Sequence, residues 1–246
     1  MVTRSAAASS VVSAVVSSPT AARAQPSAHV LARSVPPVAT KGEQTRALIL
    51  DHAVRYAAVH GFEALTIGSL AERSGLSKSG LFAHFGSKEE LQIATIDEAV
   101  RRYNETAYFP ALSAPRGLPR LRRLFEHWLD WTERSGLASC PVMAAASEFD
   151  RRNGPVRDTI EAHMRMQHTG LVKAAEMVKA SGEFDASTDT QQFAFEMFGI
   201  FMAYYRARNL FRDARAAQRA RNAFERLVSA AQLPVAPVRP VRRKST

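Results

Sequence analysis

A short stretch from Thr66 to Phe85 constrains the fold of this chain more than any other part of the sequence. Two short helices joined by a tight turn pack at a steep angle. They need a small residue where they cross and a residue that tolerates positive φ in the turn. Ala71 and Gly75 meet these needs, and Leu81 follows where it can anchor the second helix. The spacing predicts a helix-turn-helix over residues 66–85, although a generic helical hairpin would show the same pattern.

The segments on either side of this motif extend it to a small helical domain. After the motif, Ser87 and Glu90 have the spacing of a capping box, which predicts a helix that starts there and reaches about Tyr108. We therefore expect a three-helix DNA-binding type of domain over residues 43–103. Before the motif, residues 43–60 place apolar side chains on one helical face, namely Ile49, Ala53, Tyr56 and Ala57.

The second half of the chain also reads as helix throughout. Helix formers such as Ala, Leu, Arg, Glu and Met dominate, and alternating strand patterns are hard to find. Segment 110–119, which is rich in proline, is the expected loop between two domains. We predict an all-α fold with a C-terminal helical bundle over residues 117–232. Its expected helices are 118–134, one after Pro141, 155–181, one from Ser187 or Thr188 to about Phe211, and 214–231.

The formal charge of +10 comes mostly from the two ends of the chain. Residues 1–40 carry three arginines and no acid, and residues 233–246 carry four basic residues and no acid. Residues 41–102 balance eight basic against eight acidic residues. Net charge is therefore weak support for an anionic partner. We expect residues 1–41 to be a disordered tail and residues 233–246 to be a basic tail that contains prolines.

Several classes of protein are disfavoured by the sequence. A single cysteine, Cys140, excludes a disulfide within the chain. No apolar run reaches the roughly 18 residues of a membrane span, and the N-terminal segment lacks the dense apolar centre of a signal peptide. No metal-ligand spacing, phosphate loop or nucleophile elbow occurs. We expect a cytoplasmic protein that is not an enzyme, with no metal, no cofactor and no membrane partner.

Several short sequence words lie in and around the motif, namely Gly61-Phe62, Thr66, Leu70-Ala71, Gly75-Leu76-Ser77, Leu81-Phe82, His84-Phe85 and Lys88-Glu89-Glu90-Leu91. With these words, residues 43–103 resemble the N-terminal domain of the TetR/AcrR family of bacterial transcriptional regulators. The C-terminal half is similar to the family in helix count and order, and residues 140–150 and 154–157 resemble one subgroup of its ligand domains. The resemblance implies a sequence-specific DNA-binding transcriptional regulator.

The helix that ends at Phe85 is expected to enter the major groove of double-stranded DNA. Lys78 can reach guanine edges or a phosphate, and Lys88 would form an anion site with the backbone N–H groups that begin its helix. Two residues depart from the family. Phe82 stands where Tyr is usual and lacks the hydroxyl that can touch a phosphate, and Ala57 stands where Phe is common. The predicted DNA-binding residues are Thr66 (also the predicted N-cap of the first motif helix), Ser77, Lys78, Ser79, Gly80, Phe82, His84 and Lys88.

Residues 193–205 are apolar on nearly every helical face. A helix at a monomer surface keeps a polar face, so this helix is expected to cover both its own core and a partner. The resemblance also implies pairing through the last two helices; burial wholly inside the monomer is the alternative. A two-fold homodimer suits a palindromic operator. The predicted interface residues are Phe198, Phe201, Met202, Tyr205, Ala217, Ala220, Phe224 and Leu227.

A pocket for a small-molecule effector is implied by the resemblance. The candidate lining residues are chosen by residue type, and each type is more often found in a core. Such a lining predicts an apolar or aromatic effector. Cys140 is expected to be a small buried side chain, with a redox or electrophile sensor as the alternative. The candidates are Trp128, Trp131, Met143, Phe149, His163 and Met164.

Together these features predict a ligand-responsive repressor. Effector binding in the C-terminal domain would favour a dimer in which the two recognition helices have an altered spacing. A transcriptional activator uses the same fold and is one alternative. A helical protein-interaction module without specific DNA binding is another.

Overall fold

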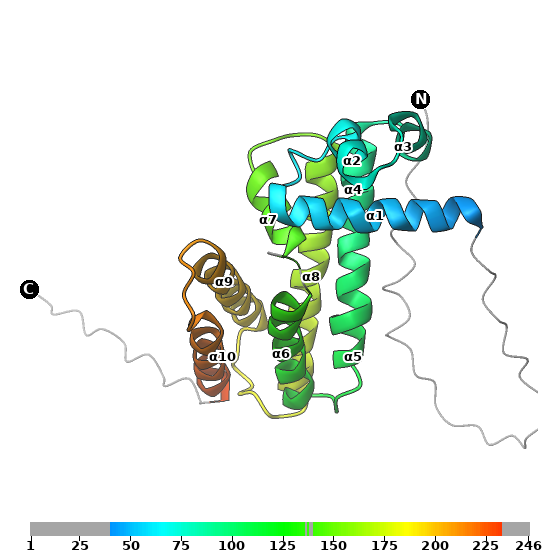
Figure 1. Cartoon of the computed structure of the whole chain (residues 1–246). Helices are drawn as coiled ribbons and strands as arrows, with labels where there is room; N and C mark the ends of the chain where they lie inside the picture. Colours follow the sequence, from blue (N-terminus) through cyan, green and yellow to red (C-terminus); the bar gives the residue numbers. More distant parts are fainter. Residues whose placement is uncertain (1–39, 136, 138–139, 233–246) are drawn as a thin grey trace, which may run out of the picture. The chain divides into compact units, whose positions relative to one another are not determined.

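The described part of the chain is helical and contains no strand, as predicted. This computed structural model describes residues 40–135, 137 and 140–232, which belong to one unit of the chain. All but two residues of the predicted tails, 1–41 and 233–246, lie outside these ranges. The elements, shown in Figure 1, are α1 (Lys41–His60), α2 (Ile67–Ser74), α3 (Lys78–Phe85), α4 (Lys88–Tyr103), the π-helical segment η2 (Asn104–Tyr108), α5 (Phe109–Ala111), α6 (Leu118–Arg134), α7 (Pro141–Phe149), α8 (Pro155–Ala180), α9 (Thr190–Asn209) and α10 (Ala216–Gln232).

Helix ends follow the capping residues. Thr40 caps α1: its hydroxyl accepts from the Glu43 N–H at 3.3 Å, and the Glu43 carboxylate accepts from the Thr40 N–H at 2.7 Å. This pair starts α1 at Lys41, two residues earlier than predicted. At the start of α9 the prediction was wrong, because Asp189 rather than Ser187 or Thr188 accepts from the first free backbone N–H groups of the helix.

One helical rod runs from α4 through η2 to α5, so the prediction of a loop starting at Pro110 was wrong. Pro110 lies in the first turn of α5, a position at which proline is tolerated. In η2, between α4 and α5, the Phe109 N–H donates to the Asn104 carbonyl, one residue further back than in an α-helix. Only residues 112–117 separate this rod from α6.

Two hydrophobic cores hold the described residues together. We call residues 40–103 the head and residues 104–232 the body. The body core lies between the rod and α6, α8, α9 and α10. The head core is built by α1 to α4, and Ala145, Phe149, Val156 and Ile160 of the body complete it. The predicted boundary between residues 103 and 117 therefore does not separate the cores. In Figure 1, α8 runs alongside α4, and these two helices pack against each other.

Polar contacts also join α7 to the loop between α1 and α2. The Glu148 carboxylate accepts from the backbone N–H groups of Phe62 at 3.1 Å and Glu63 at 2.8 Å. The Glu63 side chain in turn pairs with Lys88 at 3.1 Å and with Arg152. These bonds fix the end of α7 against the head.

Candidate nucleic-acid interface

The motif helices α2 and α3 are held by reciprocal caps and a left-handed turn. The Ser69 N–H donates to the Thr66 hydroxyl oxygen at 3.0 Å, and the Thr66 N–H donates to the Ser69 hydroxyl oxygen at 3.0 Å. Gly75 ends α2 with φ 71° and ψ 9°, the left-handed conformation that the sequence pattern required. Ser77 then caps α3 by accepting from the Gly80 N–H at 3.1 Å.

The inner face of α3 anchors it to the head, and its outer face is free. Leu81 and Phe85 are buried in the head core. Lys78, Ser79, Phe82 and Ala83 are exposed, and α3 contains no acidic residue. Lys78 takes part in none of the ion pairs found among the described residues. Its Cε lies 4.0 Å from the position that a Cβ on Gly68 would occupy. The outer face is therefore an accessible, positively charged surface.

The other predicted DNA-binding residues have partners within the chain. The hydroxyls of Thr66 and Ser77 serve as caps, so each has one acceptor site already in use. Lys88 pairs with Glu63, as described above. His84 is half-buried, with its ring 6.3 Å from that of Phe85. Their contacts to DNA stay predictions.

The predicted capping box at Ser87 is only half formed. The Ser87 hydroxyl accepts from the Glu90 N–H at 3.0 Å. The Ser87 N–H, which Glu90 was expected to receive, donates to the Phe85 carbonyl at 2.7 Å instead. The tight turn between α3 and α4 supplies this backbone acceptor, so the side chain of Glu90 is not needed there.

Arg46 lies beside the motif and was missed by the sequence reasoning. It is exposed on α1, and its guanidinium carbon lies 5.2 Å from the centroid of the Phe85 ring. The structure thus places a second cation next to α3. The available signal was a basic residue near the start of the helix that precedes the motif, but only the fold brings it to the end of α3.

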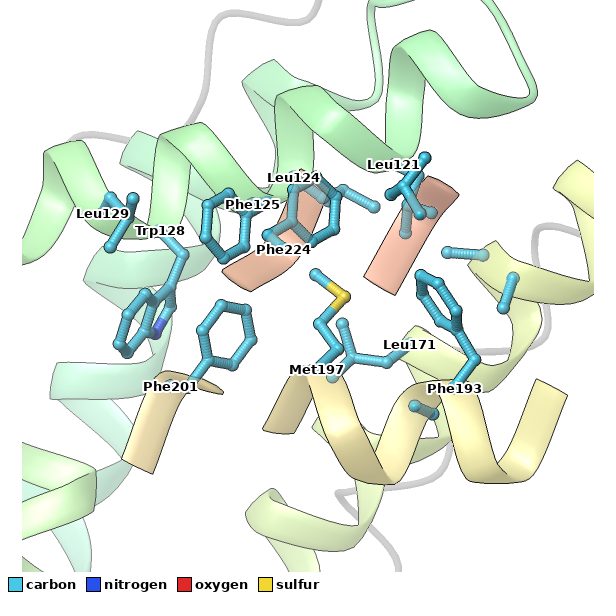
Figure 2. Packing of buried hydrophobic residues seen from close by; sticks show 14 of the residues in the cluster. Leu121, Leu124, Phe125, Trp128, Leu129, Leu171, Phe193, Met197, Phe201 and Phe224 are labelled. Carbon is cyan, nitrogen blue, oxygen red and sulfur yellow. The ribbon is translucent and has the colours of Figure 1, made fainter. Parts of the chain in front are cut away.

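The predicted effector-pocket residues mostly form cores. Trp128 stacks on Phe201 with 4.1 Å between ring centroids (Figure 2). Trp131 and Met143 are also buried in the body core. Phe149 belongs to the head core. The contacts of these residues to an effector stay predictions.

Two further predicted pocket residues lie where head and body meet. Met164 packs against both cores. The Nε2 of His163 lies 2.7 Å from the Asp97 carboxylate of α4.

One surface hollow, of about 230 Å³, lies elsewhere on the head, and its lining includes His52, Tyr56 and Arg73. No group of three or more metal-binding side chains occurs among the described residues.

The predicted dimer interface divides into two sets. Phe201, Ala220 and Phe224 are buried inside the protomer, so the prediction that they contact a partner is corrected. Figure 2 shows the Phe224 ring against Phe125, with 4.1 Å between the centroids. These rings fill the space between α6, α9 and α10. The remaining predicted residues are only partly buried, namely Phe198, Met202, Tyr205, Ala217 and Leu227.

A hollow of about 480 Å³ runs between α9 and α10 on the outer surface. Its floor consists of small and aliphatic residues, and Glu196 and Arg226 carry its charges. Neither of these residues forms an ion pair within the described chain. Phe195, 67% exposed, lies next to Glu196 on α9. The apolar residues that line the hollow are Gly199, Ile200, Ala203, Ala223, Leu227 and Ala230.

None of the helices in residues 40–135 and 140–232 is both long and apolar enough to cross a lipid bilayer.

Two family models match this chain in sequence. Residues 49–95 match the model of bacterial regulatory proteins of the tetR family, and residues 117–224 match a tetracyclin repressor-like C-terminal domain. The transcriptional repressor AcnR of Corynebacterium efficiens is 41% identical over 66 residues, 27% of this chain and 35% of that protein. AcnR of Corynebacterium jeikeium is 26% identical over 152 residues, 60% of this chain and 76% of that protein. The chain thus spans about a third of the first relative and about three quarters of the second.

Solved structures with the same fold cover most of both chains. A TetR-family regulator of Streptomyces coelicolor has a TM-score of 0.68 and 18% identity, covering 77% of this chain and 97% of its own. One of Cytophaga hutchinsonii has a TM-score of 0.70 and 16% identity, covering 80% and 99%. AibR, solved with isovaleryl coenzyme A and operator DNA, has a TM-score of 0.59 and 22% identity, covering 78% and 100%.

Proposed function

The chain belongs to the tetR family of bacterial regulatory proteins, a family of DNA-binding transcriptional regulators, and we propose that it is a homodimeric repressor whose α3 binds a palindromic operator. A small molecule that binds the body releases it from DNA. The protein acts in the cytoplasm, where the chromosome is accessible, and has no catalytic activity of its own.

The observation that carries this proposal is the free outer face of α3. Leu81 and Phe85 anchor its inner face in the head core, so α3 has a fixed position on the head. Lys78 stands on the outer face without a carboxylate partner among the described residues. A short helix with an unpaired lysine and hydroxyls at its exposed N-terminal end fits the major groove, where lysine can bind guanine N7 and O6 or a phosphate.

The test is to select the preferred duplex from a random pool and then to measure its affinity for Lys78→Ala over a range of salt concentrations. Loss of one cationic contact per half-site is expected to weaken binding at least tenfold and to make the dependence on salt less steep. Lys173→Ala, an exposed lysine on α8 with no partner among the described residues, removes the same charge and should bind as the wild type does. Wild-type protein that shows no sequence preference at physiological salt would overturn the proposal.

Dimerisation is proposed through the hollow between α9 and α10. Its small residues allow helices of a second copy to approach closely, and the two-fold axis can bring Glu196 of one copy near Arg226 of the other. Ala203→Glu places a charge on the apolar floor and is expected to yield monomers in light scattering. Ala180→Glu, at an exposed position of α8, should remain dimeric. An unchanged mass for Ala203→Glu would place the interface elsewhere.

The effector is proposed to be small and predominantly apolar or aromatic, since the body core is rich in aromatic side chains. AibR, which shares the fold, was solved with isovaleryl coenzyme A, so acyl thioesters are screened beside small apolar and aromatic compounds. Ligand release is expected to show as loss of the operator complex on titration with such compounds.

A reporter gene behind the selected operator tests the sign of regulation. Deleting the regulator should raise expression of the reporter, and a fall in expression would indicate an activator.

A further inference from the structure

The recognition helix exposes a large apolar side chain. Phe82 is 58% exposed on α3, and Ala83 beside it is also exposed. No ring or cation of the described residues contacts the Phe82 ring. Exposure of a phenyl ring to water is unfavourable, and burying one gains free energy in proportion to the apolar area that is covered. Binding of DNA by α3 would therefore be favoured if it covered the Phe82 ring and removed it from water.

Phe82 shares the outer face of α3 with Lys78. The two residues are four positions apart, so their side chains lie one above the other on the helix. When Lys78 reaches a base edge in the major groove, Phe82 also faces the floor of the groove, about one turn of α3 away from Lys78. The phenyl ring has no hydrogen-bond donor for a phosphate. The apolar group that a base pair presents in the major groove is the C5-methyl group of thymine.

We propose that Phe82 is a specificity-determining residue that reads a thymine methyl group in each operator half-site. This inference rests on the proposed operator binding by α3 and adds to it the identity of one base contact. Lys78 supplies the polar contact, and Phe82 supplies an apolar contact that depends on a single methyl group. The operator half-site accordingly contains a thymine within a few base pairs of the position bound by Lys78.

The experiment removes only that methyl group. In the selected operator, each thymine of a half-site and its symmetric mate are replaced by deoxyuridine, which keeps all hydrogen-bonding groups of thymine. Burial of one methyl group corresponds to about a threefold to fivefold change in affinity, so a symmetric pair should cost roughly tenfold or more at one position. Anisotropy titration of wild-type protein against each duplex measures this loss.

Variants of the protein assign the effect to Phe82. Phe82→Ala should bind the thymine and deoxyuridine operators with equal affinity at the sensitive position, because the ring that senses the methyl is gone. Phe109→Ala, at an exposed phenylalanine of α5, should retain the wild-type sensitivity. Since the Phe82 side chain lies outside the core, both variants are expected to fold, and circular dichroism checks this.

The outcomes separate this inference from the proposed function. Wild-type protein that selects an operator but binds every deoxyuridine duplex as it binds thymine would overturn the role of Phe82 and leave operator binding intact. A methyl effect that persists unchanged in Phe82→Ala would also overturn it. Absence of any selected operator would instead overturn the proposed function.

Discussion

At the scale of single residues, Gly75 sets the direction in which α3 leaves α2. Its φ of 71° is strained for a residue with a Cβ, yet no atom lies within 4 Å of the position a Cβ would take. The cost of Gly75→Ala is therefore a backbone cost, expected to be about 1 kcal/mol of unfolding free energy. Urea denaturation of the variant measures it.

The control is Gly42→Ala, in the first turn of α1. There the backbone is not left-handed, and the nearest atom to an added Cβ is the Thr40 hydroxyl oxygen at 4.0 Å. This change should be neutral or stabilising by up to about 1 kcal/mol, because alanine favours helix over glycine. A Gly75→Ala variant that is as stable as Gly42→Ala would mean that the turn at Gly75 is not left-handed in solution.

Cys140 is a second residue whose surroundings decide its chemistry. Burial raises the pKa of its thiol to about 11, against smaller opposing effects of the Met143 and Val142 backbone N–H groups. A raised pKa leaves less of the reactive thiolate at pH 8. We expect the folded protein to react with a disulfide reagent at least about a hundredfold more slowly than the unfolded chain. Equal rates would show an accessible thiol and would favour the sensor alternative.

At the scale of helices, local sequence predicted most of the elements. The spacing of apolar residues and the prolines gave α6 its bounds, Leu118–Arg134, and the motif gave α2 and α3 to within one residue. These signals act over a few residues, through caps and backbone preferences. Such local signals do not predict contacts between segments that are far apart in the sequence. Nothing local to Phe149 shows that it completes the head core, or that Phe201 is covered by Trp128.

The contact between α7 and the loop of residues 61–66 leads to a prediction for Glu148. Its carboxylate accepts from the N–H groups of Phe62 and Glu63. Glu148→Ala leaves both donors without this partner, so we expect these two amides to exchange with solvent about tenfold faster, as for a loss of about 1–2 kcal/mol. Hydrogen exchange resolved by NMR measures this.

A matched control is Glu176→Ala on α8. This glutamate is exposed and forms no hydrogen bond or ion pair with another described residue, so its loss changes the same charge without freeing a donor. Protection at Phe62 and Glu63 should then stay at the wild-type level. Unchanged protection in Glu148→Ala as well would mean that α7 does not hold the loop in solution.

At the scale of the whole molecule, the head core predicts cooperative unfolding, because residues of the body complete it. Both tryptophans, Trp128 and Trp131, lie in the body, whereas Phe149 packs in the head core. Phe149→Ala is expected to cost about 3 kcal/mol and to lower the denaturation midpoint seen by tryptophan fluorescence. If the head unfolded independently, this midpoint would stay where it is in the wild type, and a separate head transition would appear in circular dichroism.

The π-helical turn of residues 104–108 sets how far α5 is rotated, about the helix axis, relative to α4. Such a turn accommodates one residue more than an α-helical turn, and each residue of an α-helix advances the chain by about 100°. With one residue fewer, this segment would close an α-helical turn, although Pro110 would still interrupt the hydrogen bonding. Ala111 and the residues after it would then be rotated by that angle, away from the body core that Ala111 now fills. The extra residue of this turn thus lets α4 face the head core while Ala111 faces the body core.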